Sequence, residues 1–210
     1  YKRIWFWIIT VIIIVAIGGN MGKSGSNDSS SSSSSSTSKN SSSSSSSQKS
    51  INGLTKANFD KITVSDSTGT SESDVQSMFG KKPDSTDEQT VQNVTAKMYT
   101  WSGVENSDLT STIVVSFENG HAISKAITGL KVNRSSKITL DQFNNLQNGT
   151  SKADVQKQFG KPNGYDYSNV GGQSDEMWEY TSDVNGSLGA NFNVTFTNGV
   201  VSGKTQTSMK

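Results

Sequence analysis

The chain has no cysteine and a single histidine among its 210 residues. The absence of cysteine excludes disulfides, thiolate nucleophiles, zinc sites with cysteine ligands and lipid attachment through an N-terminal cysteine. One histidine excludes His-rich metal sites and leaves His121 as the one candidate imidazole base. Nineteen basic and eighteen acidic residues give a formal net charge of +1, so no basic excess favours a nucleic-acid partner.

The first part of the chain contains one long uncharged run, which starts at Ile4, ends at Gly19 and follows two basic residues. Such a run predicts a single-pass membrane anchor over residues 1–21, with the C-terminal head outside the cytoplasm. The alternative is a cleaved signal peptide that ends at the small residues Ala16 and Gly18. Both alternatives export the rest of the chain, and the anchor is the favoured one.

Residues 22–50 are nearly all serine. This composition has no apolar area to bury, so ordering the segment would lose chain entropy without compensation. The segment is therefore predicted to be a disordered linker that holds a folded head away from the membrane.

Two later stretches share most of their residues: 69–83 reads GTSESDVQSMFGKKP and 149–162 reads GTSKADVQKQFGKP. Each predicts a short helix, because it has an S-x-x-D capping-box spacing, apolar residues four apart, and a glycine and a proline at its end. Val75 and Val155 are predicted to face the core. The match indicates a duplicated unit, with repeats over residues 51–132 and 133–210.

Each repeat also predicts an earlier short helix and then at least three antiparallel strands. Asn-Gly pairs at 119–120 and 198–199 predict type I′ hairpin turns. Four polar stretches are predicted to be long loops: 84–96, 102–111, 164–175 and 182–189. The predicted fold class is α+β, with two tandem helix-helix-antiparallel-sheet repeats behind a transmembrane helix and the serine-rich linker. The helices are expected on one face of the sheet, with the other face open to water.

This order of elements resembles the β-lactamase inhibitor protein family. The resemblance rests on the repeated helix motif, an aromatic strand and a V-x-F-x-[ND]-G hairpin in both repeats, and it covers residues 51–210. The chain also resembles related envelope proteins of the outer-membrane assembly lipoprotein type, and tandem, membrane-anchored surface proteins of Gram-positive bacteria. In the inhibitor family an open, concave sheet face grips a target enzyme and a hairpin loop enters its active site. That loop has no residue-by-residue match here, and the family's disulfides have no counterpart in a cysteine-free chain.

Four aromatic residues allow two interpretations. Tyr99 and Trp101 share one strand face, as do Trp178 and Tyr180. The polar residues between them suit water, so the aromatic faces are expected to pack against the helices as core. In the alternative, these rings and His121 are anchors for a partner protein, because tryptophan and tyrosine dominate interface hot spots.

No catalytic, cofactor or metal site is predicted. The sequence has no G-x-S-x-G, P-loop, dinucleotide-binding or H-E-x-x-H motif, and His121 is expected to be an exposed hairpin residue. Two acidic runs lack calcium-loop spacing and are interpreted as solvated loops: Asp84, Asp87 and Glu88, and Asp175, Glu176 and Glu179.

These features predict a non-catalytic, membrane-anchored module that binds another protein outside the cytoplasm through its open sheet face. The alternative is a structural or assembly protein of the cell envelope, whose partner is the cell wall or an assembly complex. A hydrolase that uses His121 is a distant third hypothesis.

Overall fold

The computed structural model describes residues 53–91 and 94–210, which belong to one compact unit over residues 52–210. The predicted anchor (1–21) and the predicted linker (22–50) lie outside the described residues. Within the described part of the chain, no helix has the length and apolar character needed to cross a bilayer. The predicted division at residues 132 and 133 stays a prediction.

The described residues contain four short helices in two pairs, and the helices predicted from the sequence there are confirmed. They are α2 (Lys56–Lys61), α3 (Glu72–Phe79), α4 (Leu140–Asn145) and α5 (Lys152–Phe159). Each begins at a side-chain hydroxyl that accepts a hydrogen bond from the backbone amide three residues later, at Thr55, Ser71, Thr139 and Ser151. Gly80 ends α3 in the left-handed conformation that the absence of a Cβ permits, with φ 69°.

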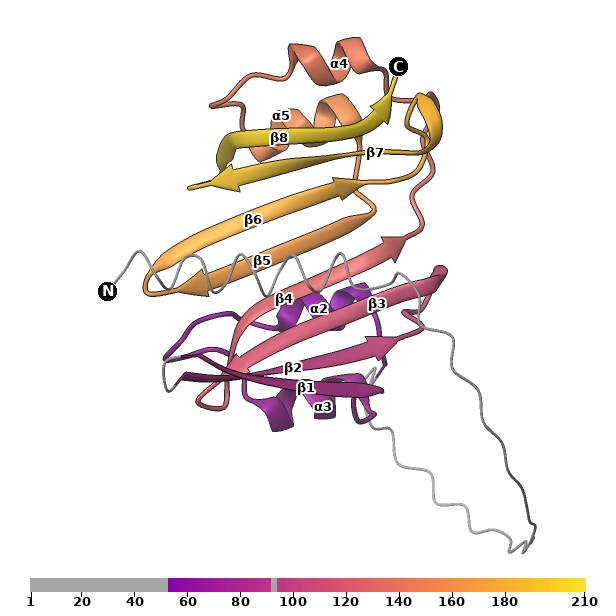
Figure 1. Cartoon of the computed structure of the whole chain (residues 1–210). Helices are drawn as coiled ribbons and strands as arrows, with labels where there is room; N and C mark the ends of the chain where they lie inside the picture. The colour runs from indigo at the N-terminus through magenta and orange to yellow at the C-terminus, as the bar shows by residue number, and fades with distance from the viewer. Residues whose placement is uncertain (1–52, 92–93) are drawn as a thin grey trace, which may run out of the picture. The chain divides into compact units, whose positions relative to one another are not determined.

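Eight strands form a single antiparallel sheet in which neighbours in the chain are neighbours in space (Figure 1). They are β1 (Ser85–Val91), β2 (Val94–Ser102), β3 (Ser107–Glu118), β4 (His121–Leu130), β5 (Gly164–Val170), β6 (Gln173–Tyr180), β7 (Gly186–Thr197) and β8 (Val200–Met209). The β3–β4 and β7–β8 hairpins turn at the Asn-Gly pairs, where both residues have positive φ. The predicted turns are confirmed.

The predicted fold class is wrong. The described residues form one mostly β unit on a single eight-stranded sheet, not two separate helix-helix-sheet repeats. The error lies in two predicted loops, because 84–96 contains β1 and 164–175 contains β5. β5 pairs with β4 from Ser124–Ser168 to Ile127–Tyr165, and this pairing makes the sheet continuous.

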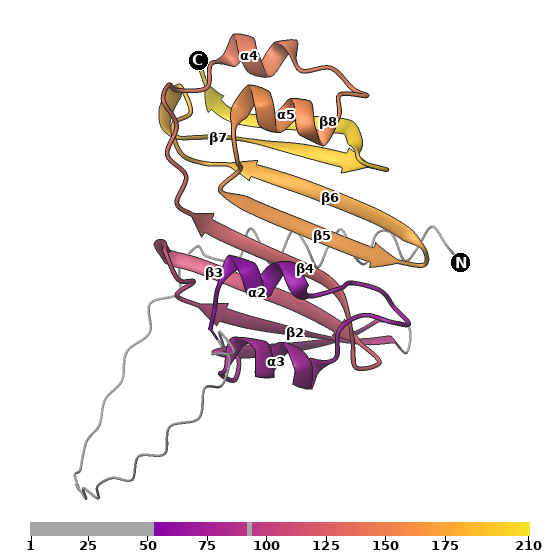
Figure 2. The ribbon, with the colours of Figure 1, turned by 180° about the vertical axis from the view of Figure 1, so that it is seen from behind.

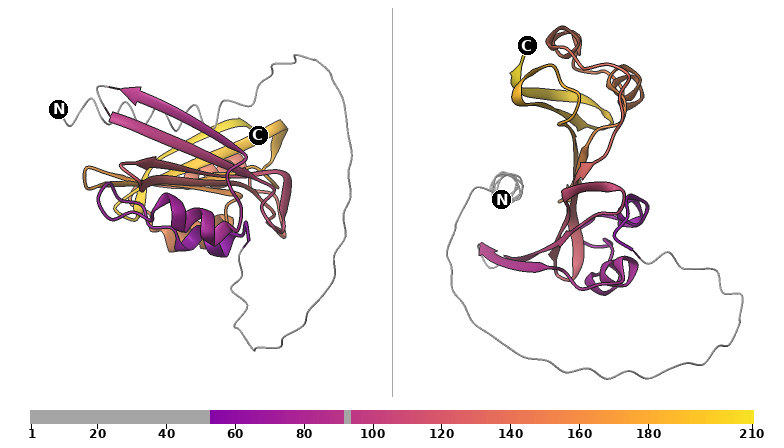
Figure 3. Two further views of the ribbon diagram at one scale, coloured as in Figure 1. Left: turned by 90° about the horizontal axis from the view of Figure 1, so that it is seen from below. Right: turned by 90° about the vertical axis from the view of Figure 1, so that its right-hand side faces the viewer.

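All four helices cover the same face of the sheet (Figures 2 and 3). Beneath them lie two groups of buried side chains, and Val75 and Val155 are fully buried as predicted. The larger members of the first group are Phe59, Phe79, Trp101, Ile113 and Phe117, and those of the second are Phe143, Phe159, Tyr180, Phe192 and Phe196. Burial of these side chains is the main force that holds the helices to the sheet.

Among the described residues, no helix covers the opposite face of the sheet. The outer strands at both edges curl away from the helices, so this face is concave (Figure 3). The right-handed twist of β-strands produces such curvature in a large open sheet. We call this surface the uncovered face.

One lysine in each half of the sheet fixes the C-terminal end of a short helix. Lys125 in β4 donates from Nζ to the carbonyl oxygen of Ile62 (2.7 Å), the residue after α2, and to that of Phe59 (3.0 Å), within α2. Lys204 in β8 donates to the carbonyl of Phe143 (2.6 Å) at α4, and to two further carbonyls there. Each ammonium satisfies carbonyls that a helix end leaves without intrahelical partners.

Candidate binding surfaces

Three of the aromatic residues considered as binding anchors are buried beneath the helices. Trp101 and Tyr180 have no exposed surface and Trp178 is 5% exposed. The Trp101 indole donates to the Lys81 carbonyl (3.2 Å), and the Tyr180 hydroxyl donates to the Gly160 carbonyl (3.2 Å). These positions support the core interpretation, because a partner can reach none of these rings without displacing the helices.

Tyr99 is half-buried and also points toward the helix-covered face. Its hydroxyl donates to Glu72 Oε2 of α3 (2.6 Å), and Lys97 lies 3.4 Å from the same carboxylate. The hydrogen bond to Glu72, and burial after it, raise the pKa of Tyr99 to about 12. Tyr99 therefore attaches α3 to the sheet and is not part of the uncovered face.

The second half makes the corresponding attachment with the charges exchanged. Lys152 of α5 pairs with Glu176 of β6 (2.7 Å), and the Trp178 indole donates to Glu176 Oε1 (2.6 Å). The two halves thus fix corresponding helices, α3 and α5, to corresponding strands, β2 and β6, with ion pairs of opposite polarity.

His121, the first residue of β4, is half-exposed beside the N-cap of α3. Its Nδ1 lies 2.9 Å from the Gly69 carbonyl oxygen, and its backbone pairs with that of Ser71. Within 53–91 and 94–210, the ring has no hydrogen bond to a carboxylate or hydroxyl. This arrangement anchors the hairpin to the loop before α3, and it lacks the partner that a general base needs.

The uncovered face carries acidic and small polar side chains and, within the described strands, no lysine or arginine. The strand lysines Lys97, Lys125 and Lys204 all point to the helices instead. The register places these residues together near the middle of the uncovered face: Ser124, Asp166, Ser168, Asp175, Met177, Glu179, Asn193 and Thr195.

At the centre of this face two carboxylates lie close together with an unpaired amide oxygen. Glu179 is opposite Gly164 in β5 and Asn193 in β7, and Asp166 is two residues along from Gly164. A Cβ built on Gly164 would lie 2.8 Å from Glu179 Oε2, so the glycine makes room for that carboxylate. Asn193 Oδ1 is buried and has no hydrogen-bond partner among the described residues.

Burial, and secondarily the charge of Glu179, raise the pKa of Asp166 to about 7. Burial also raises the pKa of Glu179. The centre of the uncovered face thus holds an amide oxygen without a partner in the described part of the chain and two carboxyl groups whose charged forms a donor-rich, positively charged group would stabilise. Among the described residues, no group of three or more metal-ligating side chains occurs.

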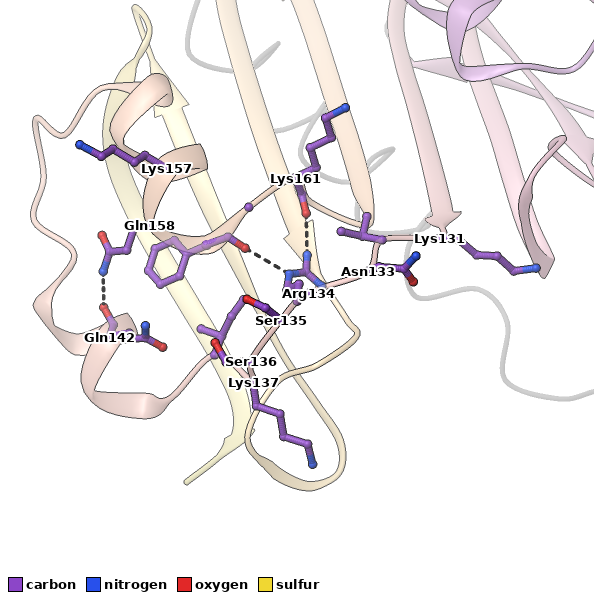
Figure 4. A pocket seen from close by; sticks show the side chains of 14 residues that line it. Lys131, Asn133, Arg134, Ser135, Ser136, Lys137, Gln142, Lys157, Gln158 and Lys161 are labelled. Atoms are coloured by element: carbon purple, nitrogen blue, oxygen red, sulfur yellow. Dashed lines mark hydrogen bonds between the residues drawn. The ribbon is translucent and has the colours of Figure 1, made fainter.

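The segment between β4 and α4, residues 131–137, borders a hollow of about 470 Å³. Arg134 lies at its centre and donates to the carbonyls of Lys161 (2.6 Å) and Phe159 (3.1 Å) (Figure 4). It also donates to the carbonyl of Ser182 (2.8 Å). Its guanidinium is thus committed to holding the segment in place. Four lysines surround it with their ammonium groups directed outward: Lys131, Lys137, Lys157 and Lys161 (Figure 4).

A family described as "Domain of Unknown Function with solved-structure structure" matches residues 52–209. The chain belongs to this family, DUF3862. No curated protein matches the chain.

A solved relative of this DUF3862 chain is a Streptococcus mutans protein described as a "putative beta-lactamase inhibitor protein". The two are 22% identical with a TM-score of 0.58, and the match covers 73% of this chain and 95% of that one. At this identity the likeness shows the fold alone. It supports the predicted resemblance to β-lactamase inhibitor proteins, whereas the resemblance to outer-membrane assembly lipoproteins, the Gram-positive origin and the membrane anchor stay predictions.

Sequence reasoning missed the central residues of the uncovered face. The sequence predicts Asp175 and Glu179 to lie in a solvated acidic run, but both lie in β6 and point to this face. It also predicts a loop at Asp166, which lies in β5. The available signal was the alternation of Tyr165 and Tyr167 with polar residues, which is typical of a strand with one buried face.

Proposed function

We propose that this DUF3862 chain binds another protein through the uncovered face of its sheet. The observation that carries the proposal is the face itself, which is concave, spans eight strands and has no helix over it among the described residues (Figure 3). Sheets of this kind commonly bury one face and present the other to solvent or to a partner.

The chemistry of the face favours a partner with a basic contact surface. Asp166, Asp175 and Glu179 lie on it without a lysine or arginine among the described strand positions. The buried Asn193 Oδ1 also needs a donor. A lysine or arginine of the partner would pair with these carboxylates and donate to the amide oxygen.

The proposal includes the anchor and the location predicted from the sequence, with the head tethered outside the cytoplasm. It also holds that the module acts without catalysis, because the His121 ring is bonded to a backbone carbonyl and no motif supplies a nucleophile. The description of the Streptococcus mutans relative supports an inhibitor-like binder.

Site-specific photocrosslinking of the full chain in its own cells tests the proposal. A benzophenone side chain at Met177 or Thr195, on the uncovered face, should form an adduct with one protein. The same group at the exposed Gln156 of α5, on the helix-covered face, is the control and should not. Glu179→Lys should reduce the Met177 adduct severalfold through repulsion of a basic partner.

Two outcomes would count against the proposal. Equal adduct formation from Gln156 would mean that the uncovered face has no special role. An adduct with wall polymer instead of protein would favour the structural envelope alternative.

A further inference from the structure

Two leucines are as exposed in the folded chain as a leucine would be in an extended peptide. The exposed fractions are 101% for Leu109 and 104% for Leu188. The next most exposed large apolar side chain in the described residues is Val200, at 39%. A single exposed leucine is unremarkable, but two fully exposed ones at corresponding places in the two halves point to a shared use.

Each leucine is held out of the sheet by an interruption in strand pairing. In β3, pairing with β4 passes from Ser107–Leu130 to Thr112–Thr128, which leaves residues 108–111 opposite Gly129 alone. Gly129 has φ 73°, and a Cβ there would lie 2.9 Å from Ser111 Cα, so a side chain at this position would be strained and would clash with Ser111.

β7 repeats this geometry. Its pairing with β8 passes from Gly186–Met209 to Asn191–Thr207, which leaves residues 187–190 opposite Ser208, also at positive φ. Leu188 projects from this second interruption. Both interruptions lie near the first residues of their strands.

The two projections lie at the same end of the sheet. β3 and β7 both begin at this end, which also holds the segment 131–137 between β4 and α4 (Figures 1 and 2). We call it the linker end, after residues 131–137 and not after the serine-rich segment. Four strand spacings of about 4.8 Å place the two projections about 20 Å apart. Because one continuous sheet carries both, they can touch the same plane together.

Lysines occupy the space between the two leucines. Lys131 follows Leu130, whose partner Ser107 precedes Leu109 by two residues. Lys137 precedes Ile138, whose carbonyl accepts from the Asn185 amide in the β6–β7 connection that leads to Leu188.

Lys157 and Lys161 complete the group around the hollow, where their ammonium groups face solvent (Figure 4). In the described structure none of the four lysines forms an ion pair. Asp84, Glu105, Asp108 and Asp183 also lie at this end, so the lysines are accompanied there by acidic side chains.

We propose that the linker end docks on a bilayer that contains anionic lipids. Leu109 and Leu188 would enter the headgroup region, and the lysines between them would contact lipid phosphates. Coplanar apolar tips with unpaired cations between them match a flat anionic surface. A protein partner would instead require pockets matched to each tip. The inference is independent of the partner proposed for the uncovered face, which lies across the strands and not at their ends.

Spin labels on the full chain test this inference, and the cysteine-free sequence allows single-site labelling. A nitroxide at T110C or S187C sits beside each leucine and keeps it. A label at S174C, in the β5–β6 hairpin at the opposite end, is the matched control. The chain is reconstituted into vesicles of phosphatidylcholine alone or with 30% phosphatidylglycerol, and label access to oxygen and to a water-soluble nickel complex is measured.

In vesicles with phosphatidylglycerol, the labels at 110 and 187 should be more accessible to oxygen than to the nickel complex, whereas the label at 174 should stay accessible to the nickel complex. K131Q/K137Q should lower the equilibrium constant for docking on the vesicle roughly 10- to 30-fold. K61Q/K152Q, with the same change in net charge away from the linker end, should leave it within about twofold. L109S/L188S should abolish immersion.

Three results would overturn the inference. Labels at 110 and 187 could stay nickel-accessible in both vesicles, immersion could be the same without phosphatidylglycerol, or the two double-lysine variants could have equal effects. The vesicles contain no other protein, so failure here leaves the photocrosslinking test of the uncovered face unaffected.

Discussion

Replacement of Lys125 by methionine removes an ammonium while keeping an unbranched apolar stem. Lys125 is 7% exposed, and its Nζ donates to the carbonyls of Ile62, Phe59 and Asp60 at 2.7, 3.0 and 3.4 Å. Lys204→Met makes the matched change in the second half, at a lysine that is less buried and donates to three carbonyls of α4 and the residues after it. The pair separates the effect of the hydrogen bonds from the effect of burial.

The structure gives the expected magnitude for Lys125. Loss of two charge-assisted hydrogen bonds within 3.0 Å costs about 3–6 kcal/mol. Methionine also removes the cost of burying a charge. Burial lowers the pKa of Lys125 from 10.5 to about 8, which corresponds to about 3 kcal/mol. We therefore expect Lys125→Met to lower the free energy of unfolding by about 0–3 kcal/mol near pH 7.

The sign of the pH dependence provides a sharper test. Between about pH 8 and 10.5 the unfolded chain binds more protons at Lys125 than the folded chain does, so the folded wild type gains stability as the pH rises. Lys125→Met lacks this gain. The difference in stability between wild type and variant should therefore widen from pH 7 to pH 10, and should widen less for Lys204→Met.

Urea unfolding of residues 52–210 at pH 7, 8.5 and 10 measures the loss of unfolding free energy and its dependence on pH. Trp101 and Trp178, the only tryptophans in this part of the chain, report unfolding by fluorescence. A difference for Lys125→Met that stays constant across these pH values would refute the reasoning from burial. A variant clearly more stable than wild type at pH 7 would refute the role of the hydrogen bonds.

Three further predictions concern the same unit. The wild type should lose about 2–4 kcal/mol of stability as the pH rises from about 4 to 7, because the folded Asp166 carboxyl, whose pKa is raised to about 7, binds a proton that the unfolded chain does not. Asp166→Asn should remove this loss, and urea midpoints at pH 4 and 8 check this. Phe159→Ala should lower the unfolding free energy by about 3–5 kcal/mol through loss of a buried ring, whereas the exposed Gln156→Ala changes it by less than about 0.5 kcal/mol in the same assay. Gly129→Ala should cost about 1–3 kcal/mol, because its Cβ would contact Ser111 at positive φ, and an unchanged thermal midpoint would contradict the account of the interrupted pairing.

The local elements could be predicted because their signals lie within a few residues. The capping hydroxyls of Ser71 and Ser151 start α3 and α5, and the buried residues Val75 and Val155 mark the faces that these helices bury. Asn-Gly pairs set the β3–β4 and β7–β8 turns for the same reason, since few other residues adopt positive φ twice in succession. The core position of Trp101 followed from the polar residue beside it.

The single sheet could not be predicted in this way. β1 has the polar sequence STDEQTV, which shows no apolar alternation, and in β5, GYDYSNV, the alternation is limited to the two tyrosines. Both acquire strand structure from pairing with a neighbour. The backbone hydrogen bonds between β4 and β5, which join the two halves, depend on residues about forty positions apart and leave no local pattern.

The sequence by itself determined the duplicated order of elements, the ends of the helices, the hairpin turns and the residues that form the core. The tertiary structure alone decided that all eight strands share one sheet, that Asp166, Glu179 and Asn193 meet on its uncovered face, and that Leu109 and Leu188 project at one end. The physical reason is range. Caps, turns and amphipathic faces depend on neighbours within about one helical turn, whereas the surfaces available to a partner depend on which distant strands pair.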